Sequence, residues 1–299
     1  MAQGTGRFGA VVTAMVTPFA DDGSLDVGGA VALARWLAAH GSDALVVSGT
    51  TGEGPVLDDT EKVDLWRAVA ESVTVPVVAA SGTNDTRHSI ELTKLAAAAG
   101  VDGILLVTPY YSRPSQAGLA AHFEAVASVV VLPVLLYDIP VRAGRRIAPD
   151  TMVHLARTVP TIIGVKDATG DVAAAARLVA AAPDGFDLYS GDDELTLPLL
   201  AVGAVGVVSV ASHWAGPELG ELVASVAKGD LERARAINGL LLGSYAFESS
   251  DRFPNPLPAK AACRALGLAA GQCRLPLGPA TDELDAAARA VVAALGTRR

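Results

Sequence analysis

The 299-residue sequence has only two cysteines, few aromatic residues and no long apolar run. Cys263 and Cys273 form no CxxC pair, so we expect reduced thiols rather than a disulfide framework or a zinc site. No apolar stretch approaches the roughly 18 residues of a membrane helix. Met1–Ala10 also lacks the apolar centre of a signal peptide. These absences predict a cytoplasmic protein without a membrane anchor.

Basic residues are scarce as well. The chain has 23 Lys plus Arg against 32 Asp plus Glu, which gives a formal net charge of −9. Binding to phosphate backbones requires a basic surface, so nucleic acid is not expected as a partner. Hydrophobic residues make up 51% of the chain and charged residues 18%, which excludes a disordered chain and predicts a large core or subunit interface.

Short apolar runs alternate with helical segments along most of the chain. The runs are rich in Val, Ile and Leu without polar alternation, which is typical of strands buried on both faces. They are Val11–Val16, Ala44–Ser48, Val75–Ser81, Gly103–Thr108, Pro133–Asp138, Ile162–Lys166, Phe186–Ser190 and Gly206–Val210. Eight strand-plus-helix units predict an α/β fold, a closed (β/α)₈ TIM barrel. The alternative is an open doubly wound sheet, but its dinucleotide-binding form requires GxGxxG where Thr17-Pro18-Phe19 stands.

The segments between the runs are predicted to be helices, because they are rich in Ala, Leu, Glu, Lys and Arg. They are Asp26–His40, Asp58–Ser72, Asp85–Ala99, Ser115–Ser128, Pro149–Thr158, Asp171–Ala181, Asp192–Val202 and Gly216–Ala227. The alternation ends near Lys228. We therefore predict a catalytic barrel over 1–227 and a C-terminal helical region over 228–299, with helices at Leu231–Ser244, Pro258–Leu266 and Asp282–Leu295.

The active site of a β/α barrel lies where the strands end and the βα loops begin. Polar residues follow several of the predicted strands, and in a barrel they gather on one rim. They are Ser48–Glu53, Thr108–Tyr111, Tyr137–Asp138 with Arg142, Lys166–Asp167 and Ser190–Asp193.

Lys166 ends the apolar run that begins at Ile162. Burial at this point favours the neutral amine, which can attack a carbonyl group and form a Schiff base. The alternative is a lysine that extends its aliphatic stem past the core and keeps its ammonium group in water. Position alone leaves both interpretations open.

Hydroxyl and cationic groups accompany this lysine. Thr50, Tyr111 and Tyr137 can pass a proton between substrate and solvent, because hydroxyls both donate and accept. The Gly49–Gly52 turn can hold a small anion, although it lacks the GK[ST] of a nucleotide P-loop. Arg142 can bind a carboxylate through two hydrogen bonds. Each residue taken singly also suits a packing, turn or solvated-loop role.

Metal ligands are not indicated. The acidic run Asp192-Asp193-Glu194 is more typical of the first turn of a helix than of a cation site. None of the five histidines stands at a predicted strand end beside a carboxylate. We therefore assign none of the histidines to catalysis or to a metal.

A set of motifs nearly spans the chain. They are Thr13–Phe19, Gly49–Glu53, Thr108–Tyr111, Tyr137–Arg142, Gly164–Gly170, Ser190–Asp193, Pro254–Lys260 and Arg274–Leu277. Together they resemble the dihydrodipicolinate synthase (4-hydroxy-tetrahydrodipicolinate synthase) family of the pyruvate-dependent class I aldolase superfamily. The lysine strand and GTTGE are typical of the superfamily, whereas the paired threonines, TPYY and Arg142 are more specific to the synthase.

The resemblance implies roles for the catalytic residues. Lys166 would form the Schiff base with pyruvate, and Tyr137 would exchange protons with that imine. Thr50 would link Tyr137 to Tyr111, which would reach in from a neighbouring subunit. The family commonly forms homotetramers, and no metal or organic cofactor is implied.

It also implies a substrate pair. Thr51 and the backbone around Val208 would hold the carboxylate of pyruvate. Arg142 would bind the carboxylate of L-aspartate 4-semialdehyde. The implied enzyme is a lyase that makes 4-hydroxy-tetrahydrodipicolinate in lysine and diaminopimelate biosynthesis.

The sequence departs from the family at several positions. Gly54 stands where many members have Ser, and Ala143 stands where Ser or Thr often follows the arginine. These changes leave open a sister pyruvate-dependent aldolase or lyase that acts on a different aldehyde or 2-oxo acid; a barrel that binds without turnover is a third alternative. Asp59, Lys62 and His88 replace the His, His and Glu of lysine-inhibited members, which predicts weak feedback inhibition.

Overall fold

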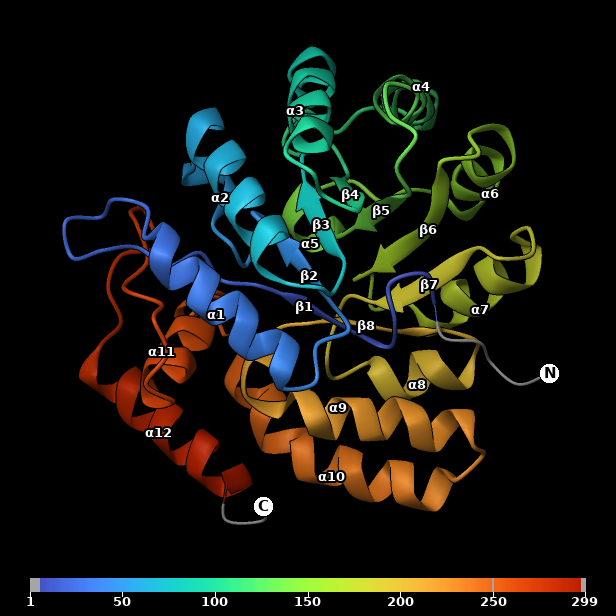
Figure 1. Cartoon of the computed structure of the whole chain (residues 1–299). Coiled ribbons are helices and arrows are strands. Elements are labelled where there is room, and N and C mark those ends of the chain that lie inside the picture. Colours follow the sequence, from blue (N-terminus) through green and yellow to red (C-terminus); the bar gives the residue numbers. More distant parts are fainter. Residues whose placement is uncertain (1–5, 249, 297–299) are drawn as a thin grey trace.

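The protein is described by a computed structural model over residues 6–248 and 250–296, so residues 1–5 of the Met1–Ala10 segment lie outside the described residues. Eight parallel strands form a closed barrel in chain order, with β1 paired to both β2 and β8. This confirms the predicted barrel (Figure 1). The strands are β1 (Val11–Ala14), β2 (Ala44–Val47), β3 (Val77–Ala80), β4 (Gly103–Val107), β5 (Val134–Asp138), β6 (Ile162–Asp167), β7 (Asp187–Ser190) and β8 (Gly206–Ser209).

Helices surround the barrel on its outer face (Figure 1). Several begin at an acidic or Ser residue whose side chain accepts a backbone N–H of the first turn, as at Asp26, Asp58 and Ser115. The helices up to the end of the barrel are α1 (Val27–Ala39), the 3₁₀ helix η1 (Gly54–Val56), α2 (Asp59–Ser72), α3 (Thr86–Ala98), α4 (Gln116–Ala127), α5 (Pro140–Ala143), α6 (Pro149–Thr158), α7 (Val172–Ala181), α8 (Thr196–Ala201) and α9 (Ser212–Ala227).

The core has two layers, which explains why the strands lack alternation. One cluster fills the barrel interior and includes Val12, Leu105 and Tyr189. The larger cluster lies between the strands and the helices and includes Leu45 and Trp66. A strand between two apolar layers meets water on neither face.

Three helix boundaries lie four residues from the predicted positions. The helix expected to end at Ser244 continues to Glu248. The helix expected from Asp192 begins at Thr196, because Asp193 turns its carboxylate to the backbone N–H groups of Val210 (2.7 Å) and Ala211 (3.2 Å). The helix expected from Gly216 begins earlier, at Ser212, and its geometry is interrupted at Ala215 before Pro217. The short helices η1 and α5 were not predicted.

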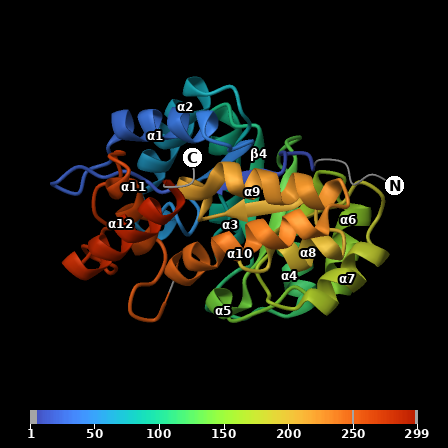
Figure 2. The same cartoon turned by 90° about the horizontal axis from the view of Figure 1, so that it is seen from below.

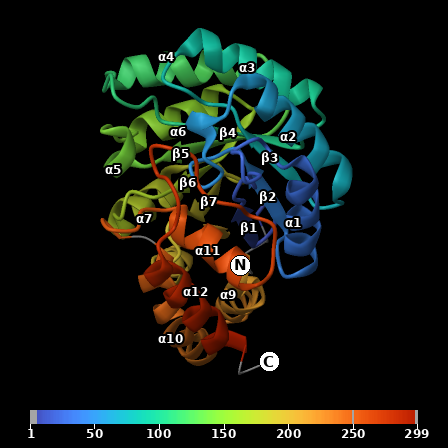
Figure 3. The same cartoon turned by 90° about the vertical axis from the view of Figure 1, so that its left-hand side faces the viewer.

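Three further helices follow the barrel: α10 (Leu231–Glu248), α11 (Leu257–Ala265) and α12 (Asp282–Gly296). The proposed boundary after residue 227 falls between α9 and α10. Figure 2 shows α10 running alongside α9, and Figure 3 shows α11 between α12 and the barrel. Within the described part of the chain, no helix combines the length and the apolar character needed to cross a membrane.

Candidate active site

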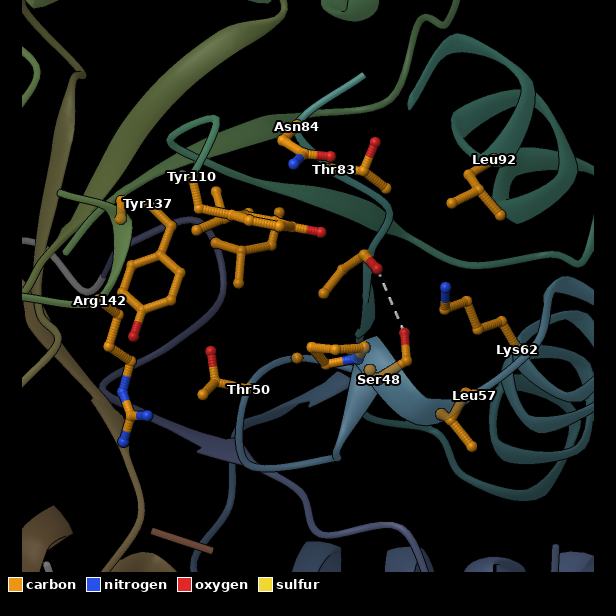
Figure 4. Close-up of a pocket in the computed structure, with 18 of the residues that line it drawn as sticks. Ser48, Thr50, Leu57, Lys62, Thr83, Asn84, Leu92, Tyr110, Tyr137 and Arg142 are labelled. Atoms are coloured by element: carbon orange, nitrogen blue, oxygen red, sulfur yellow. Dashed lines mark hydrogen bonds between the residues drawn. The ribbon is translucent and has the colours of Figure 1, made fainter. Parts of the chain in front are cut away.

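A cavity of about 630 Å³ opens where the strands end. Its wall comes from the residues that follow β2, β3, β4 and β5. Figure 4 shows the Thr50 and Tyr137 hydroxyls and the Arg142 guanidinium facing one side of it. Tyr111 also lines the cavity. Four of the predicted site residues, from β5 and from the segments after β2, β4 and β5, therefore line one cavity.

Lys166 lies immediately beside this wall. It is on β6, in register with Tyr137 on β5 and Tyr189 on β7. Lys166 is 5% exposed, and its Nζ lies 4.2 Å from the centre of the Tyr137 ring. Tyr137 therefore contacts both the cavity and the buried amine, which agrees with the buried interpretation of Lys166 and not with a solvated head.

Gly191 gives the lysine room. A Cβ at this position would lie 2.9 Å from Cγ of Lys166 and 3.0 Å from Cβ of Ala168. Real Cβ atoms do not approach other atoms so closely, so any larger residue would displace the lysine stem or the backbone behind it. The motif containing Gly191 was noted in the sequence, but this role was not.

Thr51 and Val208 are buried near the same end. Thr51 follows Thr50 in the loop after β2, and its Oγ1 accepts a hydrogen bond of 2.9 Å from Nδ2 of Asn255. Val208 is on β8 and belongs to the apolar cluster inside the barrel that also contains Tyr137. No local pattern indicates the Asn255 contact, since the two residues are 204 positions apart.

Tyr111 has an unusual backbone and exposure. Its φ is +73°, in the left-handed region that a tyrosine rarely adopts. The residue is 92% exposed although it carries a large ring. The backbone thus directs the Tyr111 ring outward at the rim of the cavity. The Tyr111 hydroxyl therefore does not reach into the barrel of its own chain.

The cavity has a second, more distant part. It is lined by Lys62, Asp59 and His88, with Leu92 beside them. Lys62 Nζ lies 3.9 Å from an Asp59 oxygen, and His88 Nε2 lies 3.0 Å from the other. Burial lowers the pKa of Lys62, and the nearby carboxylate of Asp59 opposes this. This part therefore places the Lys62 amine in an ion pair with Asp59, with Asp58 as a second acidic neighbour.

Asp138 is a buried carboxyl directly after Tyr137. One of its oxygens accepts the backbone N–H of Ile147 at 3.2 Å. Burial raises the pKa of Asp138 to about 7; the Ile147 N–H opposes the rise and the neighbouring Asp167 adds to it. Asp138 is therefore a buried carboxyl with a raised pKa, and it directly follows the candidate proton carrier Tyr137 on β5.

A buried histidine has a structural role. His213 accepts the backbone N–H of Val16 at Nε2 (3.2 Å), and its Nδ1 lies 2.8 Å from the carbonyl of Val210. Burial lowers the pKa of His213 to about 4, so it is neutral at physiological pH. It joins the segment after β1 to the end of β8, which accounts for its burial without a catalytic role.

The barrel, the cavity and the paired Lys166 and Tyr137 at neighbouring strand ends define a class of protein. A buried lysine amine beside a cavity is suited to attack a carbonyl. This is the arrangement of a β/α-barrel lyase of the class I aldolase type.

Comparisons with known proteins identify the family. A profile of the dihydrodipicolinate synthetase family matches residues 7–295. The 4-hydroxy-tetrahydrodipicolinate synthase of Acidothermus cellulolyticus is 51% identical over 97% of this chain and 93% of the relative. That of Bacillus subtilis is 44% identical over 93% and 96%. The crystal structure of the synthase from Cyanidioschyzon merolae with lysine bound has a TM-score of 0.94 at 43% identity, covering 97% of this chain and 99% of that one. This chain belongs to the dihydrodipicolinate synthetase family.

Asp138 predicts a pH dependence of stability. Its pKa of about 7 lies above the unfolded value of about 3.9. The neutral carboxyl therefore stabilises the folded protein fully below about pH 4, and this contribution is lost as the pH rises toward 7. Asp138→Asn should remove a slope of up to about 1.4 kcal/mol per pH unit from the free energy of unfolding. Urea denaturation of both proteins between pH 4 and 8 measures it; parallel curves would contradict the assignment.

The second part of the cavity predicts weak inhibition by lysine. The ammonium of Lys62 would face the side-chain ammonium of a bound lysine, and like charges repel. We expect little loss of activity at millimolar L-lysine. Lys62→Met is the matched variant, because it keeps the stem and removes the charge, and it should bind lysine more tightly. Strong inhibition of the unaltered enzyme would show that the pocket accepts lysine in another way.

Proposed function

We propose that this enzyme condenses pyruvate with L-aspartate 4-semialdehyde to give 4-hydroxy-tetrahydrodipicolinate, a step of lysine and diaminopimelate biosynthesis. Relatives of similar length are named 4-hydroxy-tetrahydrodipicolinate synthase. These names favour the synthase over a sister aldolase that acts on a different aldehyde or 2-oxo acid. The observation that carries the mechanism is the buried Lys166 amine against the Tyr137 ring at the cavity wall.

The reaction begins on the lysine. Nζ of Lys166 attacks C2 of pyruvate, and the carbonyl oxygen leaves as water after Tyr137 has supplied a proton. Tyr137, left as a tyrosinate by that step, takes a proton from the methyl group of the imine, which gives an enamine. The terminal carbon of the enamine attacks the aldehyde carbon of the second substrate, and the proton on Tyr137 passes to the aldehyde oxygen. The amino group of that substrate then attacks C2, which closes the ring and releases Lys166.

Protons move along hydroxyl groups. Tyr137 and Thr50 face the same side of the cavity (Figure 4), and Tyr111 stands at its rim. Because the Tyr111 ring is exposed on a left-handed backbone, it is suited to enter the site of a second copy of this chain. The proposal therefore includes a homo-oligomer, with a tetramer as the family's common form.

Two carboxylates are recognised separately. The Thr51 hydroxyl and the backbone around Val208 hold pyruvate close to Lys166. Arg142 is exposed at the cavity mouth and can bind the second substrate's carboxylate through its planar fork. A lysine amine and hydroxyl groups carry every step, so the scheme needs neither a metal nor an organic cofactor.

The location in the cell is also part of the proposal. Cys263 and Cys273 are buried free thiols, which suits a reducing compartment. We place the enzyme in the cytoplasm.

Covalent trapping tests the chemistry. Incubation with pyruvate and borohydride should reduce the imine and add one pyruvate-derived group to Lys166, identified by peptide mass spectrometry. Lys166→Ala should abolish the adduct and the activity, because the nucleophile is gone. Lys62→Met is the control that should still be trapped. An adduct on a different lysine, or none in the unaltered enzyme, would rule out this mechanism.

Arg142→Ala should separate the two half-reactions. Removing a partner from a hydrogen bond to a charged group costs about 1.5–3 kcal/mol, or roughly 10- to 200-fold in kcat/KM for the semialdehyde. Trapping with pyruvate should remain, since pyruvate binds deeper. Steady-state kinetics with each substrate varied measures the separation. An unchanged kcat/KM, or an unaltered enzyme that accepts only uncharged aldehydes, would favour the sister aldolase.

A further inference from the structure

We propose that the segment leading into α11 positions the pyruvate-binding loop, with Asn255 setting the direction of the Thr51 hydroxyl and Lys260 fixing the end of the loop through Glu53. This assignment rests on the proposed function, because it gives Thr51 a carboxylate to bind. It makes the C-terminal region a part of substrate recognition in the barrel.

The first observation concerns hydrogen-bond polarity. Nδ2 of Asn255 donates to Oγ1 of Thr51 at 2.9 Å, and Thr51 is 4% exposed. A hydroxyl has one hydrogen to donate, whereas a carboxylate only accepts. Because the Thr51 oxygen already accepts from the amide, its hydrogen points elsewhere. Asn255 thereby prepares Thr51 as a donor, which is the polarity that a substrate carboxylate requires.

The second observation is a buried ion pair at the end of the same loop. Lys260 Nζ lies 2.6 Å from Oε1 of Glu53, and both side chains are 1% exposed. Lys260 also donates to the carbonyl of Gln272 (2.9 Å), while the second oxygen of Glu53 accepts the backbone N–H of Arg274 (2.9 Å). Removing either Lys260 or Glu53 would leave an uncompensated buried charge. The ion pair therefore holds the loop after β2 firmly against α11.

The backbone of the loop requires such support. Glu53 has φ +54°, in the left-handed region that is unfavourable for a residue with a side chain. The carbonyl of Gly52 accepts a 2.6 Å hydrogen bond from Oγ1 of Thr17. The strained end of the loop is therefore held from both sides, by the segment after β1 and by α11.

The two contacts act as a pair because of their spacing. Thr51 and Glu53 are separated by one residue, while Asn255 precedes α11 and Lys260 lies within it. Two fixed points on each segment determine both the distance and the rotation of the loop relative to the helix. The Thr51 hydroxyl is thus oriented by residues more than 200 positions away in the sequence.

Asn255→Asp tests the polarity. An aspartate has no N–H to donate, so it accepts the Thr51 hydrogen and adds a negative charge near the substrate carboxylate. We expect KM for pyruvate to rise about 10- to 100-fold, with kcat at saturating pyruvate changed less than about threefold. Asn255→Ala, which leaves the hydroxyl free to rotate, should have a smaller effect. Arg252→Ala is the matched control, since Arg252 pairs on the surface with Glu283 of α12, and it should leave KM unchanged.

A double-mutant cycle tests the same proposal without the aspartate variant, in case that variant does not fold. If Asn255 acts through Thr51, Asn255→Ala should raise KM for pyruvate in the native background and have no further effect in Thr51→Val. Equal effects in both backgrounds, or an unchanged KM in Asn255→Asp, would overturn the assignment. These outcomes apply to enzyme that forms the pyruvate adduct on treatment with borohydride. If the unaltered enzyme forms no adduct, the result contradicts the proposed function instead.

Discussion

The register between β5 and β6 is the constraint on which the site depends. Because Tyr137 and Lys166 are paired neighbours at the carboxyl ends of these strands, the amine and the aromatic ring are held in contact by backbone hydrogen bonds rather than by mobile loops. A shift of one residue would move every side chain of β6 to the opposite face and take the lysine out of the barrel. Closure of the sheet then brings the loops after β2 and β4 to the same end.

A rigid strand pair cannot by itself select a substrate, and the loop after β2 is held by the C-terminal region. Asn255 donates a hydrogen bond to Thr51, and Lys260 on α11 pairs with Glu53. In the proposed function, these contacts orient the loop toward pyruvate. The titratable groups around the site also divide by depth. Lys166 and Asp138 are buried, whereas Arg142 is exposed at the mouth of the cavity.

Much of this arrangement could be predicted from the sequence because it follows from periodicity. Unbroken apolar runs indicated strands covered on both faces, and counting them gave the barrel and its polar rim. The rest depends on contacts between distant residues. The start of α8 is set by Asp193 binding the backbone after β8, the lysine stem requires Gly191, and the Asn255–Thr51 hydrogen bond joins segments 204 residues apart. No local pattern encodes these contacts. The assigned roles of the site residues remain predictions.

The most direct test of the account is a crystal structure of the protein soaked with pyruvate. The account predicts continuous density from Nζ of Lys166 to C2 of the ligand, with the ligand carboxylate at the Thr51 hydroxyl and the Tyr137 hydroxyl facing the imine. Pyruvate bound without a covalent bond, attached to another lysine, or turned with its carboxylate away from Thr51 would contradict it.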